Sequence, residues 1–180
     1  MRIHAEDTAA VAIDFQERLL PAVHDGDELV RSSRILLSGL NALNVPVLIT
    51  RQYPKGIGDT VREIREVTAN AITCDKLTFS CCGSEVFASA LQKLQKKNIV
   101  VFGVEAHVCV LQTALDLLTS GYKVFLATDC TGSRRPHDRL AGLRRAESEG
   151  ALLTTYEQTL FELLESSNSP AFKTISVLVR

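Results

Sequence analysis

A cysteine stands where the sequence predicts that a buried strand meets a helix, in the middle of the chain. Residues 99–104 (IVVFGV) are apolar and rich in β-branched side chains, and a helix-like pattern follows within a few residues. This arrangement is typical of a strand of a parallel sheet that leads into a helix. Cys109 near the helix start would meet free N–H groups and the positive end of the dipole, which favour a thiolate. A thiolate can attack a carbonyl carbon and form a thioester that water then cleaves.

Two distant residues could assist that cysteine. Asp14 ends the apolar run 11–14 and could take the thiol proton and return it to a leaving amine or alcohol. Positioned proton transfer of this kind contributes ~10²–10⁴-fold to a rate. Lys76 could supply a neighbouring positive charge, since a free thiol is only about 3% ionised at pH 7. Backbone N–H groups of the turn 103–109 could hold the oxyanion.

Each of these residues also has an ordinary structural interpretation. Asp14 could cap a turn, Lys76 could be a solvated surface lysine, and Cys109 could be a buried packing thiol. His107 invites a Cys–His dyad with Cys109, but side chains at this spacing diverge at a helix start. The chemistry therefore depends on whether the fold brings the three residues together.

Strand-like and helix-like segments alternate along the chain. Strands are expected at residues 11–14, 45–50, 72–77, 99–104, 122–127 and 151–154, with a loop from residue 53. Helices are expected at residues 29–43, 85–97 after a Ser84 N-cap, 108–119, 138–149 and 160–164. The alternation predicts an α/β fold with three layers, in which helices cover both faces of a doubly wound, mostly parallel six-stranded sheet. Strand order 3-2-1-4-5-6 would set Asp14 beside the strand that leads to Cys109, at the switch point.

Composition limits the classes of function. The 180 residues are 46% hydrophobic and 23% charged, which fits one globular domain over residues 1–180. A formal net charge of -1 argues against nucleic-acid or anionic-membrane partners. Apolar runs are too short for a transmembrane helix and the N-terminus lacks a signal-peptide pattern, so a cytoplasmic location is expected. The five cysteines have neither zinc-site nor C-x-x-C spacing, and reduced thiols are expected.

Three segments carry a resemblance to a known family. They are residues 12–16 (AIDFQ), 76–80 (KLTFS) and 103–110 (GVEAHVCV). Together and in this order they resemble the isochorismatase-like cysteine hydrolase superfamily, over about residues 9–164. Residues 52–58 (QYPKGIG) and 103–106 (GVEA) are similar to the isochorismatase domain-containing protein subgroup.

The resemblance implies a set of site residues. It implies a catalytic triad of Asp14, Lys76 and Cys109, and a non-proline cis peptide bond between Val104 and Glu105. It also implies that the backbone amides of Glu105 and Cys109 face the substrate oxygen. Residues beside the motifs are candidates for the substrate pocket: Phe15, Gln16, Tyr53, Phe79, Glu105 and Val108.

The sequence departs from the family at two places. Nicotinamidases carry an Asp-x-His pair after the second strand and bind a metal there, whereas residues 50–54 read TRQYP. We therefore expect no metal and no cofactor. Glu105 is acidic where many relatives have a small residue or Thr, and it could repel anions or recognise an amine.

These observations favour one function over two others. The leading hypothesis is a hydrolase, specifically an amidase-like enzyme that cleaves a C–N bond in a small amide or related carbonyl substrate through a Cys109 thioester. The alternatives are a scaffold or interaction protein on the same fold, and a thiol redox sensor that pairs Cys109 with Cys81 or Cys82. By resemblance, a homo-oligomer is expected (dimer, tetramer or larger), with a pocket completed by a neighbouring subunit.

Overall fold

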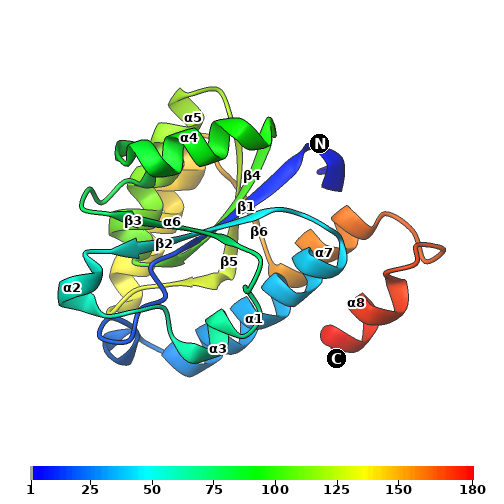
Figure 1. Ribbon diagram of the computed structural model, residues 1–180, viewed down its shortest axis with the longest axis horizontal. Helices are drawn as coiled ribbons and strands as arrows, with labels where there is room; N and C mark the ends of the chain where they lie inside the picture. Colours follow the sequence, from blue (N-terminus) through cyan, green and yellow to red (C-terminus); the bar gives the residue numbers. More distant parts are fainter. Residues whose placement is uncertain (1) are drawn as a thin grey trace.

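The computed structural model describes residues 2–180 and centres on a parallel sheet of six strands (Figure 1). The strands are β1 (Thr8–Ile13), β2 (Val47–Gln52), β3 (Ile72–Lys76), β4 (Asn98–Val104), β5 (Lys123–Gly132) and β6 (Leu152–Thr154). Their order is β3-β2-β1-β4-β5-β6, and every neighbouring pair is parallel. The predicted fold class and strand order are confirmed.

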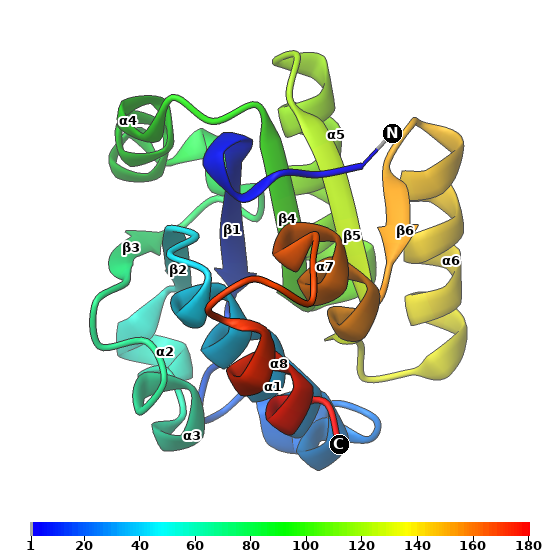
Figure 2. The same ribbon diagram turned by 90° about the vertical axis from the view of Figure 1, so that its right-hand side faces the viewer.

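Helices cover both faces of the sheet (Figures 1 and 2). They are α1 (Gly26–Ala42), α2 (Pro54–Ile57), α3 (Arg62–Arg65), α4 (Glu85–Leu94), α5 (Leu111–Thr119), α6 (Pro136–Ser148), α7 (Tyr156–Leu164) and α8 (Phe172–Leu178). Short 3-10 turns are η1 (Ala5–Asp7), η2 (Leu20–Ala22) and η3 (Cys81–Gly83), and η4 (Ala106–Val110) is a π-helical turn. Helices α1, α7 and α8 pack on one face, and α4, α5 and α6 pack on the other.

The two-residue period of the strands divides the core into two clusters. In β4, Val100 and Phe102 belong to the cluster under α1 and α7, whereas Ile99 and Val101 belong to the cluster under α4 and α5. Every residue of β1 and β4 is buried, as expected for central strands that helices cover on both sides. Both faces thus exclude water around the two strands that lead to Asp14 and Cys109.

Several segment boundaries differ from the prediction. Strand β5 continues to Gly132 rather than ending at residue 127, because its polar continuation pairs with β4 after a register shift. The stretch expected to be a loop contains the short helices α2 and α3. Helix α1 begins at Gly26, since its first turn is acidic and solvent-facing rather than apolar. The Ser84 N-cap is confirmed, because its hydroxyl accepts a hydrogen bond from the Phe87 amide.

The helix after β4 begins earlier than residue 108 and in a different form. The wider turn η4 carries Cys109, and α5 follows from Leu111. Helix α6 approaches η4 closely at Gly142, where a Cβ atom would lie 2.7 Å from the Ala106 carbonyl oxygen. Close packing by α6 therefore fixes the turn that holds the cysteine.

Gly103 allows the ends of β1 and β4 to come close together. Its φ is +128°, and a Cβ atom at this position would lie 2.2 Å from the carbonyl oxygen of Ile13. Only glycine satisfies both the backbone conformation and the space. Asp14 is the next residue after Ile13, so this approach sets the separation between the carboxylate and the turn that carries Cys109.

We predict that Gly103→Ala strongly destabilises the fold, as measured by urea denaturation. Gly121→Ala is the matched control, because Gly121 has φ +86° but nothing within 4 Å of its Cβ position. The free energy of unfolding of the control should fall by about 1–2 kcal/mol, because of the backbone conformation alone. The free energy of unfolding of Gly103→Ala should fall by roughly 1–3 kcal/mol more than that of the control, because the added methyl group has no space. Equal losses in the two variants would contradict this account of Gly103.

Candidate active site

The carboxyl ends of three strands bring the three predicted residues into one buried cluster. Asp14 directly follows β1, Lys76 is the last residue of β3, and Cys109 lies in η4 after β4. Their exposed fractions are 0%, 4% and 6%. This is the edge of a parallel sheet at which ligands bind in doubly wound folds.

A buried ion pair joins Asp14 and Lys76. Lys76 Nζ lies 2.7 Å from Asp14 Oδ2, and neither side chain is exposed. The ammonium also donates to Gln52 Oε1 at 2.7 Å, and to the carbonyl oxygens of Phe79 at 3.0 Å and Thr78 at 3.3 Å. Burial acts to lower the pKa of Lys76, but the charge of Asp14 and the nearby thiols outweigh it and raise the pKa. Lys76 is therefore a fixed cation at neutral pH.

The Cys109 thiol interacts with the same carboxylate. Burial, the charge of Asp14 and a hydrogen bond to Asp14 raise the pKa of Cys109 to about 12, although Lys76 acts to lower it. The sequence led us to expect an ionised thiol favoured by the helix start and by Lys76. In the structure, burial and the charge of Asp14 oppose ionisation of this thiol, whereas Lys76 favours it.

Two polar residues of β2 position the ion pair, and sequence reasoning missed them. The fully buried Thr50 donates from Oγ1 to Asp14 Oδ1 at 2.7 Å. Gln52 accepts from Lys76 and donates from Nε2 to the Leu77 carbonyl oxygen at 2.8 Å. The available signal was their i, i+2 spacing at the end of the strand that pairs with β1, which places both on one face.

The residues predicted to line a pocket have different environments. Phe15 is fully buried in the opposite core cluster, with its ring centroid 6.0 Å from that of Phe102, so it packs rather than facing the cluster around Cys109. Gln16 is also fully buried and links two segments, since it accepts from the Gln52 amide and donates to the carbonyl oxygens of Gln52 and Gly58. Tyr53 and Phe79 are half exposed. Val108 is partly buried beside the core cluster that includes Cys109.

Glu105 is held by an arginine rather than left free. The expected cis peptide bond between Val104 and Glu105 is present. Both carboxylate oxygens of Glu105 lie 3.1 Å from Arg134 Nε, and one accepts from the Arg134 amide. His107 Nδ1 lies 3.1 Å from Ser133 Oγ. These contacts attach the loop after β5 to η4, and they pair the Glu105 carboxylate with Arg134.

The residues described offer no evident metal site. Within residues 2–180, no three or more His, Cys, Asp or Glu side chains are grouped so that they could hold a metal ion. At the positions where nicotinamidases were expected to carry a pair of metal-ligating residues, Thr50 hydrogen-bonds to Asp14 and Gln52 to Lys76.

No helix within residues 2–180 combines the length and apolar character needed to cross a membrane.

The profile of the isochorismatase domain matches residues 8–158, the region that contains all three clustered residues. The chain belongs to the isochorismatase family. It is 36% identical to isochorismatase domain-containing protein 1 of Salmo salar over 173 residues, which are 96% of this chain and 61% of that protein. It is also 36% identical to the Danio rerio protein of the same name, over 93% of this chain and 59% of that protein. The chain thus spans about three-fifths of the length of these relatives.

Solved structures show the same fold. The MAR1 ribonuclease of Caenorhabditis elegans superposes with a TM-score of 0.94 at 36% identity, over 99% of this chain and 92% of that chain. YcaC of Escherichia coli, described as an octameric hydrolase of unknown specificity, gives 0.93 at 25% identity over 99% and 89%. YcaC of Pseudomonas aeruginosa, solved with hexane-2,5-diol and covalent acrylamide, gives 0.91 at 28% identity over 97% and 89%. The family match and these superpositions agree on an isochorismatase-like fold.

We predict that Lys76→Met destabilises the protein by roughly 3–5 kcal/mol, because it leaves a buried carboxylate without its partner. The double variant with Asp14→Asn removes both charges and should lose less than the sum of the two single variants. Urea denaturation of the four proteins of this cycle measures the coupling. Additive losses would contradict an energetically coupled pair.

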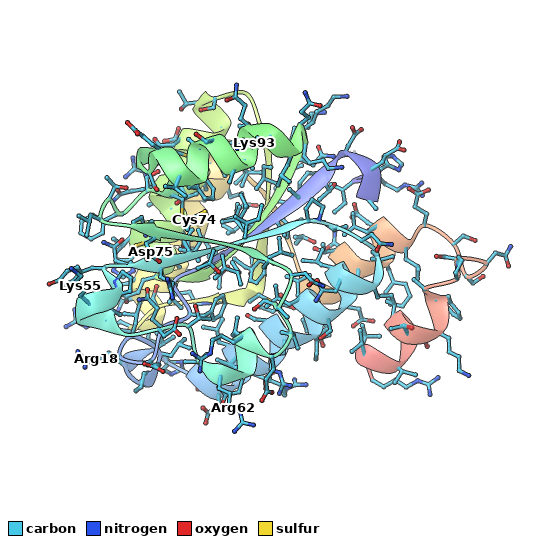
Figure 3. The ribbon with its side chains drawn as sticks, viewed as in Figure 1. Arg18, Lys55, Arg62, Cys74, Asp75 and Lys93 are labelled. Carbon is cyan, nitrogen blue, oxygen red and sulfur yellow. The ribbon has the colours of Figure 1, made fainter. Side chains whose placement is uncertain are left out.

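We predict opposite effects on Cys109 alkylation from the two charges beside it. Asp14→Asn should lower the pKa of Cys109 and speed alkylation by iodoacetamide at pH 7–9, because Asp14 raises that pKa. Lys76→Met should raise the pKa and slow the reaction. Asp75→Asn is the matched control, since Asp75 is the neighbour of Cys74 on β3 (Figure 3) and pairs with Arg51 instead. Shifts of the same sign in the Asp14 and Lys76 variants would contradict this description.

Proposed function

We propose that the protein is a cysteine-dependent hydrolase of a small amide or related carbonyl substrate, acting on a C–N bond through a Cys109 thioester. One observation carries the proposal: the buried carboxylate of Asp14 forms an ion pair with the Lys76 ammonium, and both charges act on the buried Cys109 thiol. A nucleophile and its base in contact, with the base held by a third group, is the arrangement that covalent catalysis needs. The covalent acrylamide of the Pseudomonas YcaC structure adds support, because acrylamide reacts with nucleophilic groups.

The first half of the reaction transfers one proton and forms one bond. Asp14 accepts the Cys109 proton as Sγ attacks the carbonyl carbon of the substrate. The resulting tetrahedral intermediate carries a negative oxygen, which we assign to the backbone amides of Glu105 and Cys109. When the C–N bond breaks, Asp14 returns the proton to the leaving amine, and the acyl group remains on Cys109.

Water completes the cycle. Asp14 takes a proton from the water that attacks the thioester carbon, and the C–S bond then breaks. The Cys109 sulfur recovers the proton, and a carboxylic acid leaves. Throughout, Lys76 stays charged, so it lowers the cost of negative charge on sulfur and holds Asp14 in place.

The surroundings of the cluster favour a substrate with an uncharged, partly apolar body. Tyr53, Leu77 and Phe79 are exposed by 50%, 76% and 54%, and they lie on segments that directly bond to Lys76. The nearby charge of Glu105 is balanced by Arg134. No unpaired charge in this set selects an ionic substrate, and apolar side chains are available for contact.

We also propose that residues 1–180 form one domain and that copies of the chain assemble. The octameric description of the Escherichia coli neighbour supports a homo-oligomer. A neighbouring subunit covering Tyr53, Leu77 and Phe79 would remove exposed apolar surface and enclose the pocket.

An RNA substrate is a poorer fit to this cluster, although a similar structure carries the name ribonuclease. RNA-binding sites present exposed cations to phosphates. Lys76 is 4% exposed and its ammonium is bonded to Asp14 and Gln52. RNA cleavage that survives Cys109→Ala would therefore be independent of the proposed chemistry.

We predict that a screen of small amides and carbamoyl compounds will detect an acyl adduct on Cys109. Peptide mass spectrometry after rapid acid quench identifies the modified residue, and product release measures turnover. Cys109→Ala should reduce turnover to the uncatalysed rate with an unchanged unfolding midpoint, while Cys82→Ala retains both adduct and turnover. Full turnover by Cys109→Ala on a substrate of the wild-type protein would overturn the hydrolase mechanism.

A further inference from the structure

A second cysteine belongs to the cluster around Asp14 and has no role in the proposed hydrolysis. Cys81, in turn η3, is fully buried and lies in the same core cluster as Cys109. The other three cysteines are not influenced by Asp14: Cys74 shares the core cluster, but the charge that acts on it is that of Asp75. Cys130 lies in the core cluster on the opposite face of the sheet, and Cys74 lies on β3 beneath α4 (Figure 3). Cys82 is partly exposed, and its thiol lies near Asp116 rather than Asp14.

Two threonine hydroxyls connect Cys81 to Cys109. Thr113 Oγ1 accepts from the Cys81 amide at 3.0 Å and donates to the Cys109 carbonyl oxygen at 2.6 Å, so one atom touches both backbones. The side chains are connected through the second threonine: Cys81 Sγ lies 3.8 Å from Thr50 Oγ1, and this hydroxyl donates a hydrogen bond to Asp14. The charge of Asp14 also acts on the Cys109 thiol and raises its pKa. The two sulfur atoms therefore share the neighbourhood of one carboxylate.

We propose that Cys109 and Cys81 form an oxidisable dithiol, in which a small hydroperoxide converts the two thiols into a reversible disulfide that closes the active site. The neighbouring charges suit this chemistry as they suit hydrolysis. Lys76 favours negative charge on both sulfur atoms, and Asp14 can accept a thiol proton.

The oxidation proceeds in two balanced steps. Cys109 Sγ attacks the terminal oxygen of the hydroperoxide, the O–O bond breaks, and the Cys109 proton passes through Asp14 to the leaving alkoxide. Cys109 becomes a sulfenic acid and the peroxide is reduced to an alcohol, or to water in the case of hydrogen peroxide. Cys81 Sγ then attacks the Cys109 sulfur, the S–O bond breaks, and the hydroxide leaves with the Cys81 proton as water.

The exposed fractions of the two cysteines determine the order of the steps. Cys109 retains 6% exposure, while Cys81 has none, so the peroxide meets Cys109 first. In the reduced protein, burial raises the pKa of Cys81 to about 12, with opposing contributions from Lys76 and Asp14. Cys81 is therefore a protonated thiol that stays inert until an electrophilic sulfur forms beside it.

The test is peptide mapping under non-reducing conditions after treatment with hydrogen peroxide. The wild-type protein should yield a Cys81–Cys109 disulfide, lose iodoacetamide labelling at Cys109, and regain it fully with dithiothreitol. Cys81→Ser should give no disulfide, and its Cys109 should proceed to sulfinic acid, which dithiothreitol does not reverse. Cys82→Ser is the matched control and should behave as wild type.

Iodoacetamide labelling and peptide mapping report on Cys109 without any substrate. The oxidation experiment can therefore be interpreted even if the hydrolase proposal fails. A Cys109 disulfide with Cys82, or Cys109 sulfinic acid as the first product in the wild type, would overturn the inference. Cys81→Ala provides a second variant if the serine at this buried position prevents folding. Loss of labelling that dithiothreitol reverses equally in wild type and both Cys81 variants would also overturn it.

Discussion

Burial of the Asp14–Lys76 ion pair is the constraint on which the rest of this site depends. Removing each of two charged groups from water costs several kcal/mol, unless their mutual attraction and further hydrogen bonds compensate. Here the compensation is nearly complete: Thr50 satisfies one carboxylate oxygen, and the ammonium donates to Gln52 and to two carbonyl groups of the loop after β3. Three strand ends and one loop must therefore remain in register together, since moving any of them exposes or unpairs a charge.

In the mechanism that we propose, the same pair determines how Cys109 reacts. The Asp14 carboxylate opposes ionisation of the buried Cys109 thiol and simultaneously provides a place for the proton. Our proposal therefore starts from a neutral thiol beside an ion pair and couples attack to proton transfer. Such a site avoids keeping a thiolate permanently available to unwanted electrophiles. The family assignment and the fold support hydrolysis, while the detailed route through sulfur remains our proposal.

Much of the architecture could be predicted from residue patterns because central parallel strands are continuous apolar runs and helices carry a 3.6-residue period. Strand order and the location of Asp14 and Lys76 at strand ends followed from that reasoning and from family resemblance. The effect of burial on the pKa of Cys109 could not be predicted, since a helix start and a lysine are visible in sequence whereas desolvation by distant helices is not. Phe15 was assigned to the pocket by its adjacency to Asp14, but the sequence could not show that this side chain packs in the core cluster on the α1 face of the sheet. Strand β5 was shortened in prediction because its polar residues resemble a loop until their pairing partners are known.

The loop that binds the ammonium has two unlike surfaces. Its carbonyl groups at Thr78 and Phe79 point to Lys76, while the side chains of Leu77 and Phe79 are turned to the outside. A contact made on the outer surface is separated from the buried cation by a single thickness of backbone. A partner that docks on the outer side of this loop could shift the carbonyl groups that hold Lys76, and with them the charge that acts on the Cys109 thiol. One short peptide segment would then link association to reactivity.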